Sequence, residues 1–190
     1  DLAPPDPSGP PLIVWNHRWE FDKQPEVFFA ALDAARARGR EFRLALLGEN
    51  FQFVPKEFEA ARDRLGGRIL RCGYEEDRKA YLAWLRRGSL VISTAVQENF
   101  GIAVIEAIRH GCFPLLPDRL SYPEILAEEH RSECLYRDEA DLVERLDSLL
   151  ADPGRIAHLR EPLARSVERF AWERRIESWD GELDRLARRP

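Results

Sequence analysis

Two glutamates, Glu98 and Glu106, stand eight positions apart in a stretch that predicts a buried strand followed by a helix. The apolar run at 90–92 is typical of a buried parallel strand, and residues 100–108 predict a helix, apolar on nearly every face, that ends near Gly111. Glu106 is the only ionisable residue in that helix, and burying a carboxylate among aliphatic side chains is costly without a partner. We therefore expect a hydrogen-bond donor for Glu106, supplied by the protein or by a ligand.

The segment between the two glutamates predicts an anion site. Asn99, Phe100 and Gly101, with Ile102 after them, offer backbone N–H groups at the start of a helix, where negative charge is favoured. Glu98 follows the strand at the edge of the sheet where open α/β sheets collect ligands. Two carboxylates that accept hydroxyl groups, with an anion site between them, suit a sugar joined to phosphate.

Arg18 and Lys23 form a second candidate group, directly after the apolar run at 12–15. Two cations in one short loop can converge on a diphosphate, the arginine through its planar fork and the lysine as a point charge. The alternative interpretation is a solvated loop that carries two cations. His17 is either a further phosphate contact or a structural histidine.

Two later turns carry glycine. Gly48 follows the apolar run at 42–47, and Gly73 with Tyr74 follows the run at 68–72; both glycines are also compatible with ordinary turns. No Gly-x-Gly-x-x-Gly follows the first strand and no Walker A sequence occurs, so neither NAD nor a P-loop is predicted. The histidines and the three cysteines lack metal-ligand spacing, so we predict no metal site, and we expect the cysteines in the core.

The order of elements predicts an α/β fold, a Rossmann-like doubly wound parallel sheet of about six strands with a helical C-terminal tail. We expect strands at 12–15, 42–47, 68–72, 90–93, 113–116 and 133–136, and helices at 25–38, 55–65, 77–87, 100–108, from 121, and at 138–150, 153–170 and 172–188. The expected domain organisation is a proline-rich linker at 1–11, a nucleotide-sugar-binding domain at 12–170 and a C-terminal helix at 171–190.

Composition limits the possible classes. The 190 residues are 44% hydrophobic and 33% charged, as in globular proteins, and the net charge of −5 argues against binding nucleic acid through bulk electrostatics. No apolar run reaches the length of a membrane span and no signal-peptide pattern opens the chain, so we expect a cytoplasmic protein. The sequence contains no methionine, which predicts a piece of a larger protein.

The Glu-x7-Glu pattern around Phe-Gly resembles the donor-binding signature of retaining GT-B glycosyltransferases, which also carry an Arg-x4-Lys pair after the first strand. The resemblance implies one half of a GT-B fold. It also implies that Arg18 and Lys23 stabilise the departing nucleoside diphosphate without a metal, that Glu98 binds sugar hydroxyls, and that Glu106 binds ribose hydroxyls. In that family the loops carrying Gly48 and Tyr74 flank the nucleotide base.

Four strings, WNHRWEFDKQPE, LLGENFQFVP, ISTAVQENFGIAVIEAI and GCFPLLPDRLSYPEI, resemble the C-terminal half of the tRNA-queuosine mannosyltransferase family over roughly residues 12–127. The resemblance implies transfer of mannose from GDP-mannose to queuosine in tRNA, with no cofactor beyond the nucleotide sugar. It further implies an N-terminal acceptor domain outside this chain, which would bind the tRNA, and an isolated domain that is inactive alone.

Two other functions remain open from the sequence. One is a GT-B hexosyltransferase with a different acceptor, such as a membrane lipid, and the other is a nucleotide-sugar-binding module without catalysis. Apart from the resemblance, UDP- and GDP-linked hexoses are equally compatible with the residues, and the oligomeric state is left open.

Overall fold

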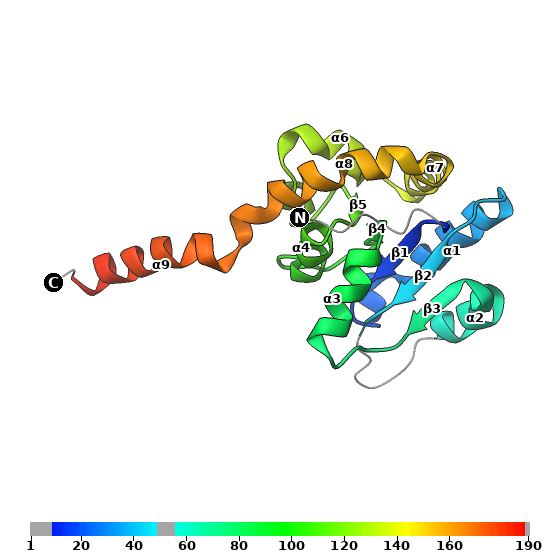
Figure 1. Cartoon of the computed structure of the whole chain (residues 1–190), viewed down its shortest axis with the longest axis horizontal. Coiled ribbons are helices and arrows are strands. Elements are labelled where there is room, and N and C mark those ends of the chain that lie inside the picture. Colours follow the sequence, from blue (N-terminus) through cyan, green and yellow to red (C-terminus); the bar gives the residue numbers. More distant parts are fainter. Residues whose placement is uncertain (1–8, 49–55, 189–190) are drawn as a thin grey trace.

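A six-stranded parallel sheet forms the centre of the computed structural model, which describes residues 9–48 and 56–188 (Figure 1). The strand order is β3-β2-β1-β4-β5-β6, and every strand pair is parallel. The strands are β1 (Leu12–Trp15), β2 (Arg43–Leu46), β3 (Ile69–Cys72), β4 (Leu90–Ile92), β5 (Phe113–Pro117) and β6 (Leu135–Tyr136). This arrangement confirms the predicted Rossmann-like α/β fold.

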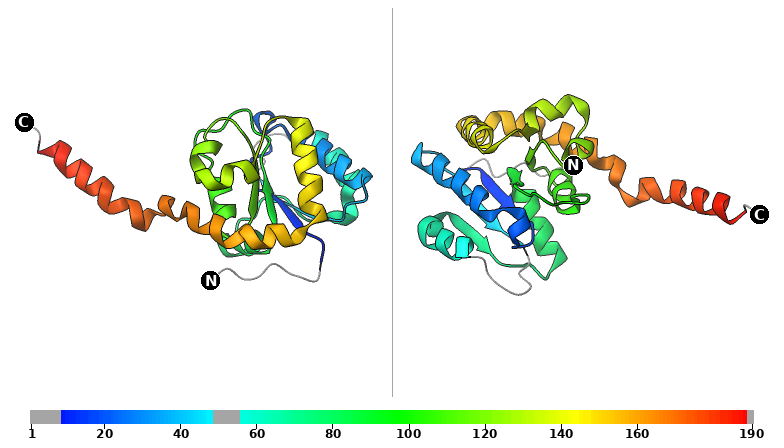
Figure 2. Two further views of the ribbon diagram at one scale, coloured as in Figure 1. Left: turned by 90° about the horizontal axis from the view of Figure 1, so that it is seen from above. Right: turned by 180° about the vertical axis from the view of Figure 1, so that it is seen from behind.

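Helices cover both faces of the sheet (Figure 2). They are α1 (Pro25–Ala37), α2 (Lys56–Leu65), α3 (Arg78–Arg87), α4 (Ile102–Arg109), α5 (Tyr122–Ile125), α6 (Glu128–Cys134), α7 (Glu139–Ala151), α8 (Pro153–Ser166) and α9 (Trp172–Ala187), with 3-10 turns at Phe21–Lys23, Gly66–Arg68 and Val167–Phe170. Helix α1 packs beside α2 and α7, whereas α4 packs beside α3 and α8. The sheet is therefore buried on both faces, which explains why its central strands are apolar throughout.

The chain reverses direction across the sheet between β1 and β4. Strands β2 and β3 lie on one side of β1, and β4 with β5 and β6 lies on the other. In doubly wound sheets, the carboxyl ends of the two strands at such a switch point border the crevice that binds ligands. The loops after β1 and β4, which carry the predicted site residues, meet at this point.

An aromatic cluster fixes the loop that follows β1. The Trp19 ring stacks on Phe58 of α2 at a centroid distance of 4.2 Å, and Trp15 packs against Phe28 of α1 at 4.4 Å. All four side chains are buried, and burying an aromatic side chain of this size contributes about 1.5–3 kcal/mol. Packing against the core thus fixes the position of the loop that follows β1.

Three predicted elements differ from the structure. Helix α4 begins at Ile102 instead of residue 100, because Gly101 takes a left-handed conformation (φ 86°) before the helix. Of the strand predicted at 133–136, only the last two residues form a strand, β6, because Cys134 belongs to the last turn of α6. The helix predicted at 153–170 ends at Ser166 and continues as a 3-10 turn. The start of α2 predicted at residue 55 lies outside the described residues.

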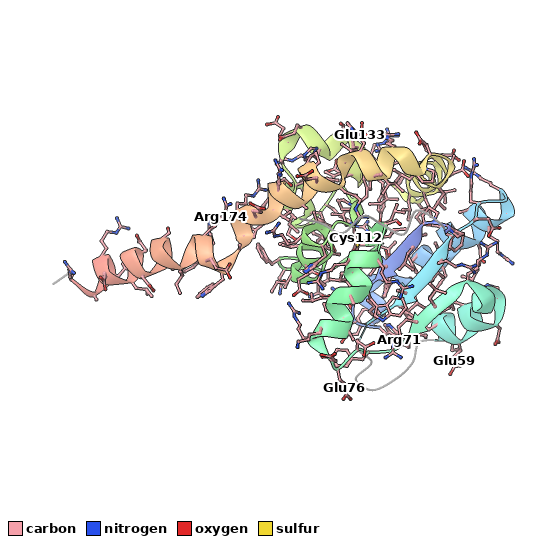
Figure 3. All side chains as sticks on the ribbon, viewed as in Figure 1. Glu59, Arg71, Glu76, Cys112, Glu133 and Arg174 are labelled. Atoms are coloured by element: carbon pink, nitrogen blue, oxygen red, sulfur yellow. The ribbon has the colours of Figure 1, made fainter. Side chains whose placement is uncertain are left out.

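The C-terminal helix α9 projects away from the rest of the domain (Figure 1). Its exposed apolar side chains, spaced mostly three or four positions apart, are Trp172, Trp179, Leu183 and Leu186. Arg174 lies on this projecting part, whereas Cys112 lies inside the domain (Figure 3). Of the described helices, none is long and apolar enough to cross a membrane.

Candidate functional site

The β1 loop (residues 16–24) points most of its polar side chains inward. Asn16, His17, Asp22 and Lys23 are buried. Backbone hydrogen bonds stiffen the loop, with the amides of residues 20, 23 and 24 donating to the carbonyls of residues 18, 20 and 21. The side chain of Arg18, by contrast, is 54% exposed and lies 3.3 Å from a carboxylate oxygen of Glu20.

The side chains of Lys23 and Glu98 are in direct contact. The Lys23 ammonium donates to the Gln97 carbonyl at 2.6 Å and to Glu98 Oε2 at 3.4 Å, and it lies 3.1 Å from Asp22 Oδ2. Burial alone would raise the pKa of Glu98, but the Lys23 charge and the Gly101 N–H outweigh it and lower the pKa below its usual value. Glu98 is therefore held as a carboxylate.

The predicted anion site is partly filled by the protein itself. Glu98 Oε1 accepts hydrogen bonds from the backbone amides of Asn99 at 3.1 Å and Gly101 at 3.0 Å. Two of the amides that we expected to bind a ligand therefore bind Glu98, because the carboxylate folds back over its own turn. The amides of the first turn of α4, from Ile102 on, have no acceptor within the helix, as at any helix start. The side chains of Phe100 and Ile102 are exposed beside this turn.

Glu106 has the donors that its position in the sequence predicted. Arg78 donates to Oε1, and the Tyr81 hydroxyl donates to Oε2 at 3.1 Å. Tyr81 in turn accepts a hydrogen bond from Asn16 Nδ2 at 3.0 Å. The sequence reasoning missed Asn16, Arg78 and Tyr81. For Asn16 one signal was present, since it is a polar residue directly after an apolar strand.

Two neighbouring cavities, of about 270 Å³ and about 290 Å³, lie at the switch point and share one residue. The first, which we call the Tyr74 cavity, is lined by Asn16, Arg18, Leu47, Tyr74, Glu75, Glu76, Arg78, Tyr81 and Glu106. The second, the Glu98 cavity, is lined by Arg18, Glu20, Phe21, Asp22, Lys23, Gln97, Glu98 and Asn99. Arg18 belongs to both. The structure thus brings the predicted cations and both glutamates to one edge of the sheet.

His17 and Gly48 have packing roles in this arrangement. His17 is 3% exposed, packs edge-on against Trp15 at 5.2 Å and lines neither cavity. Burial, reinforced by the Lys23 charge, lowers the pKa of His17 to about 4, so the ring is neutral. A Cβ on Gly48 would lie 1.8 Å from the His17 carbonyl oxygen. The structure therefore supports the structural interpretation of His17, and Gly48 is required by close backbone packing.

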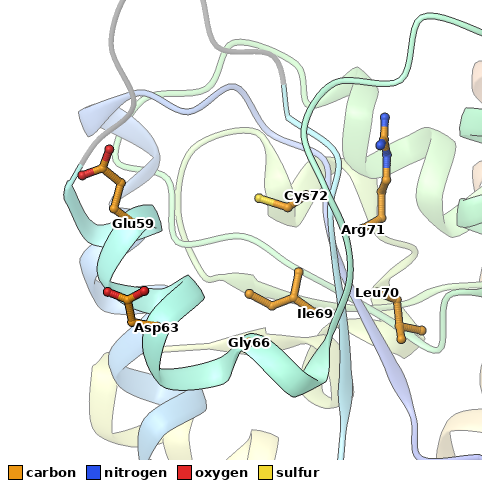
Figure 4. A pocket seen from close by; sticks show the side chains of 7 residues that line it. All are labelled: Glu59, Asp63, Gly66, Ile69, Leu70, Arg71 and Cys72. Carbon is orange, nitrogen blue, oxygen red and sulfur yellow. The ribbon is translucent and has the colours of Figure 1, made fainter.

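A larger cavity, of about 640 Å³, lies elsewhere, between α2 and the edge strand β3 (Figure 4). Glu59 and Asp63 line it from α2, and Ile69 to Cys72 line it from β3. None of the predicted site residues lines this cavity. Among the residues that the structure describes, no group of three histidine, cysteine, aspartate or glutamate side chains could hold a metal ion.

Comparison with known proteins identifies the family. Residues 3–168 match the family model described as glycosyl transferases group 1. A tRNA-queuosine alpha-mannosyltransferase from Drosophila melanogaster is 39% identical over 134 residues, 70% of this chain and 34% of that protein. A GDP-mannose-dependent alpha-(1-6)-phosphatidylinositol dimannoside mannosyltransferase from Mycobacterium tuberculosis is 25% identical over 176 residues, 93% of this chain and 44% of that protein.

Solved structures share the fold. The catalytic domain of cholesterol-alpha-glucosyltransferase from Helicobacter pylori superposes with a TM-score of 0.70 at 20% identity, over 85% of this chain and 99% of that one. The fold and the family match define a glycosyltransferase domain of the GT-B type. The chain belongs to the group 1 family of glycosyltransferases. It spans between a third and a half of the length of the two curated relatives described here.

Proposed function

We propose that this chain is the donor-binding domain of a retaining, metal-independent mannosyltransferase that transfers mannose from GDP-mannose to queuosine in tRNA. The observation that carries the proposal is the position of Arg18 between the two cavities. On one side lie Tyr74 and Glu106, which suit a nucleoside, and on the other lie Lys23 and Glu98, which suit a sugar phosphate. A diphosphate that joins nucleoside to sugar would then pass Arg18.

The chemistry required of these residues is electrostatic. As the bond between sugar and diphosphate breaks, negative charge grows on the leaving phosphate, and cations held in place beforehand stabilise it most effectively. Arg18 and Lys23 supply that charge from a stiff loop, so they take the part that a bound metal plays elsewhere. Glu98 then accepts hydrogen bonds from the hydroxyls of the mannosyl group, and Glu106 accepts them from the ribose.

The relatives support the donor and the acceptor. Both curated relatives described above are mannosyltransferases by name, and the mycobacterial name includes GDP-mannose. The name of the Drosophila relative specifies queuosine in tRNA. Because the chain covers only part of each relative, we assign tRNA binding to a segment outside this chain, and we propose that the domain alone does not transfer mannose. A tRNA substrate also fits the cytoplasmic location expected from the sequence.

A second candidate is a mannosyltransferase with a lipid acceptor. The mycobacterial relative, whose name specifies a phosphatidylinositol dimannoside, matches 93% of this chain against 70% for the Drosophila relative. The lower identity of that match, 25% against 39%, makes it the weaker candidate.

The test uses the full-length protein that contains this chain. It is incubated with GDP-mannose and tRNA that carries queuosine, and the nucleosides are analysed by mass spectrometry. We expect mannosylated queuosine, unchanged in the presence of a metal chelator, and no product with tRNA that carries guanosine at the same position. Transfer from a UDP-sugar but not from GDP-mannose would contradict the donor, and transfer only to phosphatidylinositol mannoside in vesicles would favour the lipid acceptor.

A further inference from the structure

A directed chain of hydrogen bonds runs from the β1 loop to Glu106. Asn16 Nδ2 donates to the Ala103 carbonyl of α4 at 2.7 Å and to the Tyr81 hydroxyl of α3 at 3.0 Å. The Tyr81 hydroxyl then donates to Glu106 Oε2 at 3.1 Å. Three elements that are distant in sequence are thus joined at the wall of the Tyr74 cavity.

The direction of every proton in this chain is fixed by chemistry. A backbone carbonyl only accepts, so the amide nitrogen of Asn16, and not its oxygen, must face Ala103. The second proton of that nitrogen goes to the Tyr81 oxygen, which leaves the phenolic proton for the carboxylate. Burial raises the pKa of Tyr81, so the hydroxyl keeps this proton at all ordinary pH values.

In this position Asn16 lowers the stability of the folded state. It is 9% exposed, and its Oδ1 atom is buried without a hydrogen-bond partner among the described residues. A buried acceptor that lacks a donor destabilises the folded state. An apolar residue would avoid this cost, but it would also remove the bonds to Tyr81 and Ala103.

We propose that Asn16 and Tyr81 are positioning residues for the nucleoside: they orient the carboxylate of Glu106 so that it accepts the ribose hydroxyls. This inference rests on the function proposed above, in which Glu106 binds ribose. Arg78 contacts the other carboxylate oxygen, but its side chain is 65% exposed, so the orientation depends mainly on the buried side.

The test measures how strongly binding depends on the ribose hydroxyls. Calorimetry gives the dissociation constants of GDP and of 2′,3′-dideoxy-GDP for the wild-type chain, for Tyr81→Phe and for Asn16→Ala. We expect the wild type to prefer GDP about tenfold, and Tyr81→Phe to lose most of that preference by weakening GDP while leaving the dideoxy compound unchanged. Asn16→Ala should act in the same direction. If Asn16 and Tyr81 only stabilise the fold, replacing them should weaken the binding of GDP and of the dideoxy compound equally.

Tyr136→Phe is the matched control. Its hydroxyl is also buried and donates to the Ser93 carbonyl at 2.8 Å, but Tyr136 does not line the Tyr74 cavity. We expect this variant to keep the wild-type preference for GDP. If Tyr81→Phe also keeps it, the positioning role is overturned while the proposed function stands. If the wild type does not bind GDP, the proposed function fails, and this inference fails with it.

Discussion

The ammonium nitrogen of Lys23 lies 3.4 Å from a carboxylate oxygen of Glu98, and both side chains are largely buried at the switch point of the sheet. Lys23 has three N–H donors, and Gln97, Asp22 and Glu98 supply an acceptor for each of them. A phosphate oxygen therefore binds Lys23 only by replacing one of these acceptors. The bond to Glu98 is the longest of the three, so Glu98 is the partner we expect a donor diphosphate to replace.

The position of Lys23 depends on Thr94, in the loop after β4. Thr94 is fully buried, and its hydroxyl donates to the Lys23 carbonyl at 2.6 Å and lies 3.0 Å from that of Gln24. We predict that Thr94→Val lowers the free energy of unfolding by about 1–3 kcal/mol, because the buried Lys23 carbonyl loses the hydroxyl that donates to it. Urea denaturation measures this change. Thr94→Ser keeps the hydroxyl and should lose clearly less, so equal losses in the two variants would contradict the assigned role.

Gly48 should not tolerate a side chain. Its Cβ would lie 1.8 Å from the His17 carbonyl oxygen and 2.5 Å from the Trp19 ring. We predict that Gly48→Ala lowers the free energy of unfolding by about 1–3 kcal/mol or more, because the β1 loop has to shift. Gly67→Ala is the control, since nothing lies within 4 Å of its Cβ. Thermal or urea denaturation measures both losses. Equal losses of unfolding free energy in Gly48→Ala and Gly67→Ala would show that the close approach at Gly48 is absent.

Stability should depend on pH through His17. The pKa of His17 is about 4 in the folded protein against 6.5 for an unperturbed histidine, so the unfolded chain binds more protons between these values. The resulting contribution to stability is fully present above pH 6.5 and is lost as the pH falls from 6.5 to 4, with a slope of at most about 1.4 kcal/mol per pH unit.

Urea denaturation of the wild type and of His17→Asn, carried out across this pH range, measures that contribution. The variant is less stable at neutral pH, but its free energy of unfolding should fall less steeply toward acid. Parallel pH dependence in the two proteins would contradict a neutral, buried His17.

The central strands β1, β4 and β5 could be predicted from the sequence because each is a short apolar run between turn residues. The start of α4 could not, since Glu98 occupies the amides of Asn99 and Gly101, and the helical bonds begin only after them. The need of Glu106 for a partner followed from its apolar neighbours. The partner Tyr81 did not, because it stands 25 positions away on another helix and no local pattern connects the two.

For Arg18 and Lys23, too, the sequence predicted only part of the arrangement. Their spacing suggested that Arg18 and Lys23 point at one ligand, and the structure confirms that both line the Glu98 cavity. It also shows that Lys23 is buried and already bonded to carboxylates, whereas Arg18 is exposed. That difference depends on the inward fold of the β1 loop, which rests on Trp19 packing against a helix about forty residues further along.

We propose that Arg18 binds the donor diphosphate between the two cavities. Calorimetric measurement of the GDP dissociation constant for the chain and for Arg18→Ala tests it directly, with Arg36→Ala as a control, because Arg36 lies on α1 and pairs only with Asp33 among the described side chains. We predict GDP binding at least about tenfold weaker in Arg18→Ala and unchanged in Arg36→Ala, as expected for the loss of one charge-assisted contact. GDP binding of equal strength in Arg18→Ala and the wild type would contradict it.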